Sequence, residues 1–490
     1  MKPFLKVLRR GVEWLAIILA TIVFVRAVGA RRLPDLKPWH RVVPQREVTA
    51  AELTDRFTLA EYRAREDEIW QEIRDRVESQ VPPSDRTATN RYFPGARNNP
   101  DRFPTDWNHT FELAPNETRG GALLVHGLTD APYSMRRIAQ ILRDQGIYSL
   151  CLRVPGHGTV PAALTTAQWE DWSAAVRVGA RHVRQKIGEG KPFYLIGYSN
   201  GGALVLKYSL DVLNGAPLPR ADRVVLLSPM IGVTPYTTVA RVASMLAFVP
   251  YFEKSRWLDV VPEYIPFKYN SFPVNAGRQT LRLTAVLQSE VADAAKNGSI
   301  ARLPPILAFQ SLVDSTISTD AVVDKLYAKL ADNGSELVLF DVNRANDLRP
   351  YFKDAHEDLL ARVSAGQRRY KFELVTNAHP DTIEVVARSF PKAGGAPSDT
   401  PLSLSWPRQL FSLSHVALPF PPDDPLFGTQ PDLREDYGIR IGELAPRGER
   451  SVLRIPMDDA MRLNSNPFFS YMAGRISDWL GGGSPESASH

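Results

Sequence analysis

The chain has 490 residues, enough for a large buried core and more than one minimal domain. Its hydrophobic fraction of 44% and charged fraction of 23% exclude the disordered and fibrous classes. The net charge of +5 is local, because residues 1–47 carry ten Lys or Arg against three acids, or +7, which leaves −2 for the rest. A nucleic-acid partner is therefore not predicted. The single cysteine, Cys151, allows no internal disulfide and lies in an apolar run that predicts a buried, inert thiol.

An apolar run near the N-terminus, WLAIILATIVFV at 14–25, predicts a membrane segment. Extended to 11–30, it reaches roughly the 20 mostly apolar residues that a spanning helix needs. The basic residues before it (Lys2, Lys6, Arg9 and Arg10) resist translocation, so we expect a single-pass anchor with the rest of the chain outside the cytoplasm. The alternative is a signal peptide cleaved after Val28-Gly29-Ala30, which gives a secreted or periplasmic protein. Residues 1–47 form this basic segment.

An N-terminal extension is predicted to follow at 48–118. Charges recur through 48–80 around a sparse apolar stripe, a pattern typical of a solvated helix that packs on a larger domain. Pro82 and Pro83 end this helix, and a polar stretch with several prolines follows.

Short apolar runs then alternate with helical segments. Such alternation predicts an α/β domain with a mostly parallel sheet that is covered by helices on both faces. The expected strands are 122–126, 148–154, 193–197, 223–227, 306–309 and 337–340, and the expected helices are 135–145, 167–187, 201–213 and 319–331.

Two excursions interrupt the alternation and divide the domain. Residues 230–303 are rich in Pro, Tyr, Phe and Met, and we expect them to form a cap over the core. Residues 343–408 form a second insertion that is partly helical and partly strand-like. The core is then expected in three parts, at 119–229, 304–342 and 409–490.

The sequence FYLIG-Y-S-N-GG places Ser199 between a strand and a helix. A serine hydroxyl becomes a nucleophile only when it is exposed, oriented and next to a base. A sharp turn from strand to helix presents it in this way, and Gly197 and Gly201 leave room for that turn. The five-residue motif alone is weak evidence, but the apolar strand before it and the small residues after it strengthen it.

A second element lies upstream, in ALLVHGLTDAPYSM. Acyl transfer needs two backbone N–H groups that stabilise the oxyanion, and in such an arrangement they come from the residue after the nucleophile and from the loop after an earlier strand. These are the amides of Asn200 and Leu128. His126 is a rival candidate for the base, but it precedes the nucleophile and is interpreted as structural.

With these motifs the chain resembles the bacterial carboxylesterase and monoacylglycerol lipase branch of the α/β-hydrolases. The resemblance covers about 120–342 and part of the tail, and it implies the α/β-hydrolase fold and a Ser-Asp-His triad. The matching pieces are LLVHGLTDAPYSM, LRVPGHGTVPA, TAQWEDW, IGYSNGG and LAFQSLVDSTIST.

The resemblance implies an acid after the next-to-last core strand and a base after the last one. Asp314 fits the acid; Asp341 is the second choice, and Asp320 and Asp324 also compete. No histidine ends the apolar run 337–346, so the base must lie further on. His415, in SLSHVALPF, is preferred to His379, in VTNAHPDT, although it lies 101 residues after Asp314. His356 lies on a charged helix and is interpreted as solvated.

The expected function is hydrolysis of a carboxylic ester through an acyl-enzyme, as in carboxylesterases, monoacylglycerol lipases or lysophospholipases. The substrate would be a lipid-like acyl ester, and neither a cofactor nor a metal is predicted. The proline-acid loop PFPPDDPLFG at 419–428 has no assigned mechanism; Asp423 and Asp424 are expected to cap a turn. Alternatives left open are a serine peptidase or amidase, an acyltransferase, and an inactive binding protein tethered to the membrane.

Overall fold

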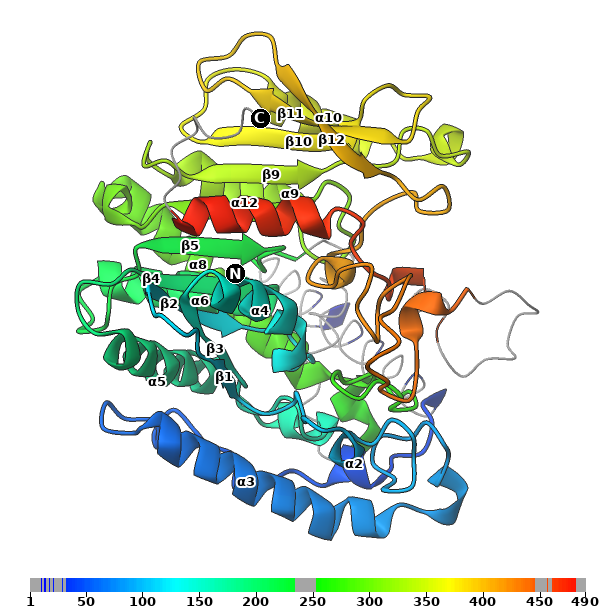
Figure 1. Ribbon diagram of the computed structural model, residues 1–490. Coiled ribbons are helices and arrows are strands. Elements are labelled where there is room, and N and C mark those ends of the chain that lie inside the picture. Colours follow the sequence, from blue (N-terminus) through cyan, green and yellow to red (C-terminus); the bar gives the residue numbers. More distant parts are fainter. Residues whose placement is uncertain are drawn as a thin grey trace.

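The computed structural model describes residues 32–233, 253–445 and 461–481, together with a few isolated positions. Ten strands form one sheet in the order β1-β3-β2-β4-β5-β8-β9-β10-β11-β12 (Figure 1). The pairs from β3 to β10 are parallel, and the pairs with β1, β11 and β12 are antiparallel. The strands are β1 (Phe111–Leu113), β2 (Gly120–Val125), β3 (Ile147–Leu152), β4 (Phe193–Tyr198), β5 (Arg223–Leu227), β8 (Ile306–Ser311), β9 (Glu336–Phe340), β10 (Lys371–Asn377), β11 (Glu384–Phe390) and β12 (Ser398–Ser405).

Helices cover both faces of this sheet, as the alternation of strands and helices predicts. Side chains alternate between the faces of a strand, so that Leu123 belongs to the buried cluster that contains residues of α5, α6 and α8, while Leu124 belongs to the cluster that contains residues of α4 and α12. These helices lie along the sheet in Figure 1. Both faces are buried, which explains why these strands are continuous apolar runs. The helices are α2 (Pro38–Arg41), α3 (Leu59–Arg76), α4 (Arg136–Asp144), α5 (Trp169–Ile187), α6 (Asn200–Leu213), α8 (Val274–Lys296), α9 (Thr319–Ala321), α10 (Ala355–Ser364) and α12 (Phe469–Gly481).

A buried ion-pair network joins the N-terminal extension to the core. The Arg153 side chain, 1% exposed just after β3, donates to the carboxylates of Glu66 on α3 (3.0 Å) and Glu47 (2.9 Å). Glu66 also accepts the hydroxyl and the amide of Thr110, and Arg153 donates to the carbonyl of His157 at 3.0 Å. The extension therefore fixes the loop that follows β3.

The second insertion enlarges the sheet, since β10, β11 and β12 continue it beyond β9 (Figure 1). The chain leaves the core after β9 and returns beside the same point. Val342 pairs with Ser412 in an isolated bridge, and the amide of Asn343 donates to the carbonyl of Phe411 at 2.9 Å. The insertion is thus closed at its base, and residues far apart in sequence meet there.

The first excursion contributes a small hairpin and a long helix. Strands β6 (Trp257–Asp259) and β7 (Phe272–Pro273) pair with each other, and α8 follows directly. Glu290 on α8 pairs with Lys207 on α6 at 3.1 Å, which ties the helix to the core. Residues 234–252 of the expected cap lie outside the described residues.

Two helix predictions need correction. The helix expected over 48–80 begins at Leu59, because Thr58 and Glu61 form a reciprocal capping box there, and it ends at Arg76. The helix expected over 319–331 is instead a short α-helical turn, a π-helical turn at Val322–Leu326 and a 3₁₀ turn at Tyr327–Lys329.

The predicted membrane segment at 11–30 lies, apart from isolated positions, outside the described residues. Where the structure does describe the chain, it contains no helix with the length and apolarity to cross a membrane.

We expect Arg153→Met to lower the free energy of unfolding by about 3–5 kcal/mol, because it leaves the carboxylate of Glu66, 2% exposed, without its cation. Urea denaturation monitored by circular dichroism measures this loss. The control is Arg181→Met, whose partner Asp55 is 83% exposed and whose loss should cost under about 1 kcal/mol. Equal losses in the two variants would contradict a structural role for the network.

Candidate active site

Ser199 lies at the turn between β4 and α6. Its φ of 53° and ψ of −116° place a non-glycine residue in a sparsely populated region of backbone conformation, as expected for a serine presented on a sharp strand-to-helix turn. Its amide donates to the carbonyl of Leu227 at 2.9 Å, and its carbonyl accepts from the amide of Met230 at 3.0 Å. Both bonds hold the turn against the neighbouring strand.

The two glycines of the motif are required by close packing of the backbone. A Cβ atom on Gly197 would overlap the carbonyl of Gly201, and a Cβ on Gly201 would overlap the carbonyl oxygen of Val125 at the end of β2. The start of α6 therefore lies directly against the strand that carries the upstream loop. This contact brings the two motifs of the sequence together.

The loop after β2 packs beside Ser199. A Cβ on Gly127 would lie 3.2 Å from the Cβ of Ser199, and Leu128 lines the same cavity as Ser199. Asn200 opens α6, so its amide belongs to the first turn, whose N–H groups have no partner within the helix. These are the two amides that the sequence nominates for an oxyanion hole.

His126 holds this loop in place. The amide of Val154 donates to Nε2 of His126 at 3.1 Å, so Nδ1 carries the proton and donates to the carbonyl of Gly127 at 2.9 Å. Burial lowers the pKa of His126 well below its ordinary value, and the ring is neutral. His126 therefore holds the loop after β2 in place, in line with the structural role that the sequence predicts for it.

Asp314 lies in the loop after β8 with a fully buried side chain. Its Oδ1 accepts the amides of Thr316 (2.9 Å) and Ile317 (3.0 Å), and its Oδ2 accepts the side-chain amide of Gln310 at 3.3 Å. Burial alone would raise the pKa of Asp314, but the charge and hydrogen bond of His415, together with the two backbone amides, lower it below its ordinary value. The carboxylate is therefore ionised at neutral pH.

The structure brings His415 to Asp314 across the second insertion. Nδ1 of His415 lies 3.1 Å from Oδ1 of Asp314, and His415 is 6% exposed. It comes three residues after Ser412, which pairs with Val342 at the end of β9. Although 101 residues separate the two side chains in sequence, the closed base of the insertion places His415 just beyond the end of β9.

The competing candidates lie elsewhere. The His379 side chain is 67% exposed between β10 and β11, with Asp381 at 3.5 Å. Asp341 is buried and pairs with Arg344 at 2.6 Å, and it accepts the hydroxyl of Thr376. The other candidates are also paired outside the cavity: Asp320 and Asp324 with Arg362, and His356 with Glu357.

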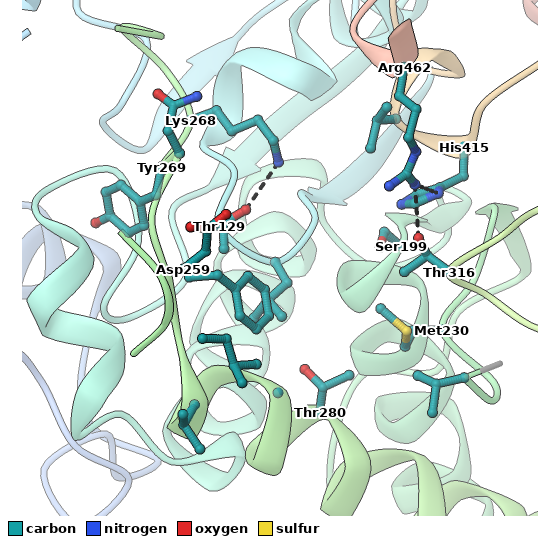
Figure 2. A pocket seen from close by; sticks show the side chains of 18 of the residues that line it. Thr129, Ser199, Met230, Asp259, Lys268, Tyr269, Thr280, Thr316, His415 and Arg462 are labelled. Atoms are coloured by element: carbon teal, nitrogen blue, oxygen red, sulfur yellow. Dashed lines mark hydrogen bonds between the residues drawn. The ribbon is translucent and has the colours of Figure 1, made fainter. Parts of the chain in front are cut away.

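Ser199 and His415 line one cavity of about 370 Å³ (Figure 2). Its apolar wall suits an acyl chain, and part of this wall comes from the predicted cap. The apolar lining residues are Leu128, Met230, Val233, Leu258, Ile265, Phe272, Val274, Leu281, Val416 and Leu463.

The cavity also contains charged residues that the sequence analysis did not identify. Arg462, near the end of the chain, donates to the hydroxyl of Thr316 at 2.8 Å and lies 3.2 Å from Nδ1 of His415. Lys268 donates to the hydroxyl of Thr129 at 3.0 Å. No motif surrounds Arg462, whereas Lys268 lies within the segment 230–303 that the sequence predicts as a cap.

The proline-acid loop has a structural role. Asp424 is buried, and its carboxylate accepts the amides of Leu426 (3.0 Å) and Phe427 (2.8 Å) and the hydroxyl of Tyr133 (2.9 Å). Asp423 faces outward and pairs with Arg137 at 2.8 Å. The turn cap that the sequence predicts is thus formed by Asp424, and it ties this loop to the segment after the Leu128 loop.

Part of the chain is similar to known proteins. Residues 116–342 match the family described as serine aminopeptidase, S33. A thermostable monoacylglycerol lipase from Bacillus sp. (strain H-257) is 38% identical over 87 residues, which are 18% of this chain and 33% of that enzyme. The chain thus matches about a third of the length of this curated relative. The predicted resemblance to α/β-hydrolases of the carboxylesterase and monoacylglycerol lipase group is confirmed.

Solved structures also resemble the chain. A soluble variant of monoglyceride lipase from Saccharomyces cerevisiae has 17% sequence identity and a TM-score of 0.37, and the match covers 47% of this chain and 82% of that one. The monoacylglycerol lipase of Paleococcus ferrophilus has 15% identity and a TM-score of 0.37, with 52% and 97% covered.

The buried carboxyl group of Asp130, the residue after Thr129, should make the folding stability depend on pH. Burial raises its pKa to about 6, although the charge of Lys268 opposes the shift. The pKa in the folded state exceeds the ordinary value of 3.8. The contribution of protonated Asp130 to the free energy of unfolding is therefore fully present below pH 3.8, and it is lost as the pH rises through about 6.

We therefore expect the stability of Asp130→Asn, relative to wild type, to increase between about pH 4 and pH 6 and to level off above pH 7. Urea denaturation at a series of pH values measures this difference. A difference that is constant over the range, or that decreases with pH, would contradict the assigned direction.

Proposed function

We propose that this protein is a serine hydrolase that cleaves carboxylic esters through an acyl-enzyme, with Ser199, His415 and Asp314 as its triad. The observation that carries the proposal is the Asp314–His415 pair at 3.1 Å, at the cavity that Ser199 lines from its turn. Few other chemistries need a strained serine, a histidine and a buried ionised carboxylate together.

In the first half-reaction, His415 Nε2 accepts the hydroxyl proton of Ser199 while Oγ attacks the ester carbon. The amides of Leu128 and Asn200 donate to the oxyanion, where transition-state charge develops. Asp314 keeps the proton of His415 on Nδ1 and stabilises the imidazolium. His415 then gives its proton to the departing alcohol, which leaves the acyl group on Ser199.

In the second half-reaction, His415 takes a proton from water as the water oxygen attacks the acyl carbon. The carboxylic acid leaves as Oγ of Ser199 recovers its proton from His415.

The apolar wall of the cavity favours an acyl chain of lipid-like character. Placement at a membrane through residues 11–30 stays a prediction from the sequence.

A peptidase or amidase is the second candidate, because the description of the matching family names an aminopeptidase. An aminopeptidase binds a free amine, for which acidic groups are suited. The described lining of the cavity instead contains three basic side chains and one acidic side chain, namely Lys268, Arg278, Arg462 and Asp259. This balance favours ester substrates over peptides with a free N-terminus.

The proposal is tested by substitution in the full chain, with nitrophenyl esters of short and medium acyl chains as substrates and a fluorophosphonate as a label. Ser199→Ala and His415→Ala should each lower kcat by about 10⁴-fold or more. His379→Ala, the matched control, should change kcat by less than about threefold, since this side chain is exposed outside the cavity.

Several results would contradict the proposal. Loss of labelling in His379→Ala with labelling retained in His415→Ala would reverse the base assignment. A wild-type chain that neither cleaves the esters nor reacts with the label would favour the inactive binding protein. Faster cleavage of amino-acid nitroanilides than of the esters would favour the peptidase.

A further inference from the structure

Three cationic side chains line the cavity, and their hydrogen-bond partners are neutral. Lys268 donates to the Thr129 hydroxyl, Arg278 to the side-chain carbonyl of Asn275 at 2.8 Å, and Arg462 to the Thr316 hydroxyl. Within the described ranges, none of the three forms an ion pair with a carboxylate. Against these three cations the described lining contains one carboxylate, that of Asp259, so the cavity carries an excess of positive charge.

These cations are partly removed from water, which makes their lack of a counter-charge unfavourable. All three are half-buried, and Nε of Arg278 is buried with no hydrogen-bond partner among the described residues. An anion that enters the cavity would supply the missing acceptor. Hydrogen bonds between charged partners are about twice as strong as those between neutral ones, so such an anion would contribute strongly to binding.

Two of the cations flank the proposed reaction centre. Arg462 lies beside His415, and Lys268 reaches from the other side of the cavity to Thr129, the residue after Leu128 (Figure 2). An ester carbonyl held at Ser199 would have its oxyanion near the loop containing Leu128 and its leaving oxygen near His415. An anionic group on the alcohol part of the ester would thus be within reach of Arg462.

The contact between Arg462 and His415 also affects which ring nitrogen of His415, the proposed base, carries the proton. An imidazole nitrogen has one hydrogen-bonding direction in the ring plane, yet Nδ1 of His415 has Asp314 at 3.1 Å and Arg462 at 3.2 Å. Only a protonated Nδ1, which donates to Asp314, leaves Nε2 free to accept the serine proton. An anion that takes the Arg462 hydrogen bond would remove the competing donor and favour this tautomer.

We propose that the substrate is an acyl ester whose alcohol part carries an anionic group, a carboxylate or a phosphate, and that Arg462 binds this group while the charge of Lys268 attracts it from the other side of the cavity. The inference rests on the proposed ester hydrolysis and names its substrate class. A planar guanidinium can bind either anion through two parallel hydrogen bonds. The acyl chain lies against the apolar wall, and the charged alcohol lies on the side of Arg462.

The test compares three substrates with the same acyl chain: 1-decanoylglycerol, 1-decanoylglycerol 3-phosphate and the decanoyl ester of glyceric acid, all below their micellar concentrations. The readout is the ratio of kcat/KM for each anionic ester to that for the neutral ester. We expect at least one ratio to be about 10 or more in the wild type, and to decrease as salt screens the charges. The two anionic esters distinguish a phosphate from a carboxylate as the group that is bound.

Arg462→Gln should lower the preferred ratio by about tenfold or more, and Lys268→Met should lower it as well. The matched control is Arg119→Gln, an exposed arginine that pairs with Glu117 outside the cavity, and it should leave the ratio unchanged. Circular dichroism checks that each variant is folded. If Arg462→Gln does not fold, Lys268→Met and the salt dependence of the wild-type ratio decide the question.

The inference is overturned if both wild-type ratios are near 1 or below. It is also overturned if the folded variants at Arg462 and Lys268 leave the preferred ratio unchanged. In either case, cleavage of the neutral ester with labelling of Ser199 would leave the proposed function standing. Failure to cleave any of the three esters, without labelling, would instead overturn the proposed function itself.

Discussion

The backbone at the carboxyl end of β4 is packed so closely that it determines the rest of the site. Side chains at Gly197 and Gly201 would overlap neighbouring backbone atoms, including the carbonyl of Val125 at the end of β2. The chain therefore turns sharply at Ser199, with its φ of 53°, and the amide of Asn200 begins α6 beside the Leu128 loop. A strained residue persists only where its surroundings over-determine its conformation, and here two adjacent strands and a helix do so.

The remaining groups reach this point from distant parts of the chain. Asp314 comes from the loop after β8 and His415 from the segment that returns from the second insertion. The bridge between Val342 and Ser412 closes that insertion, so that three additional strands extend the sheet without displacing the histidine. At the carboxyl end of β3, next to β2, the buried Arg153 network fixes the loop after β3, which in turn holds His126 and the Leu128 loop.

The sequence predicts the parallel core well, because its strands are buried on both faces and each motif lies where a strand ends. It also places Asp314 and His415 as partners, and the structure brings them together, while their catalytic roles stay proposals. The bridge at Val342 could not be predicted, since pairing between residues 70 apart has no local signal. Likewise, Arg462 has no motif around it. The hydrophobic periodicity of 319–331 also gives no sign that the α-helix beginning at Thr319 changes to a π-helical turn at Val322.

In the proposed mechanism, Ser199 carries the acyl group between the two half-reactions. Rapid acid quenching of the wild-type chain during turnover of a nitrophenyl ester, followed by mass spectrometry of its peptides, measures this directly. The peptide with Ser199 should gain the mass of the acyl group at early times, at close to one acyl group per chain when deacylation is slow. Ester turnover with no acylated peptide, or with the acyl group on another residue, would contradict it.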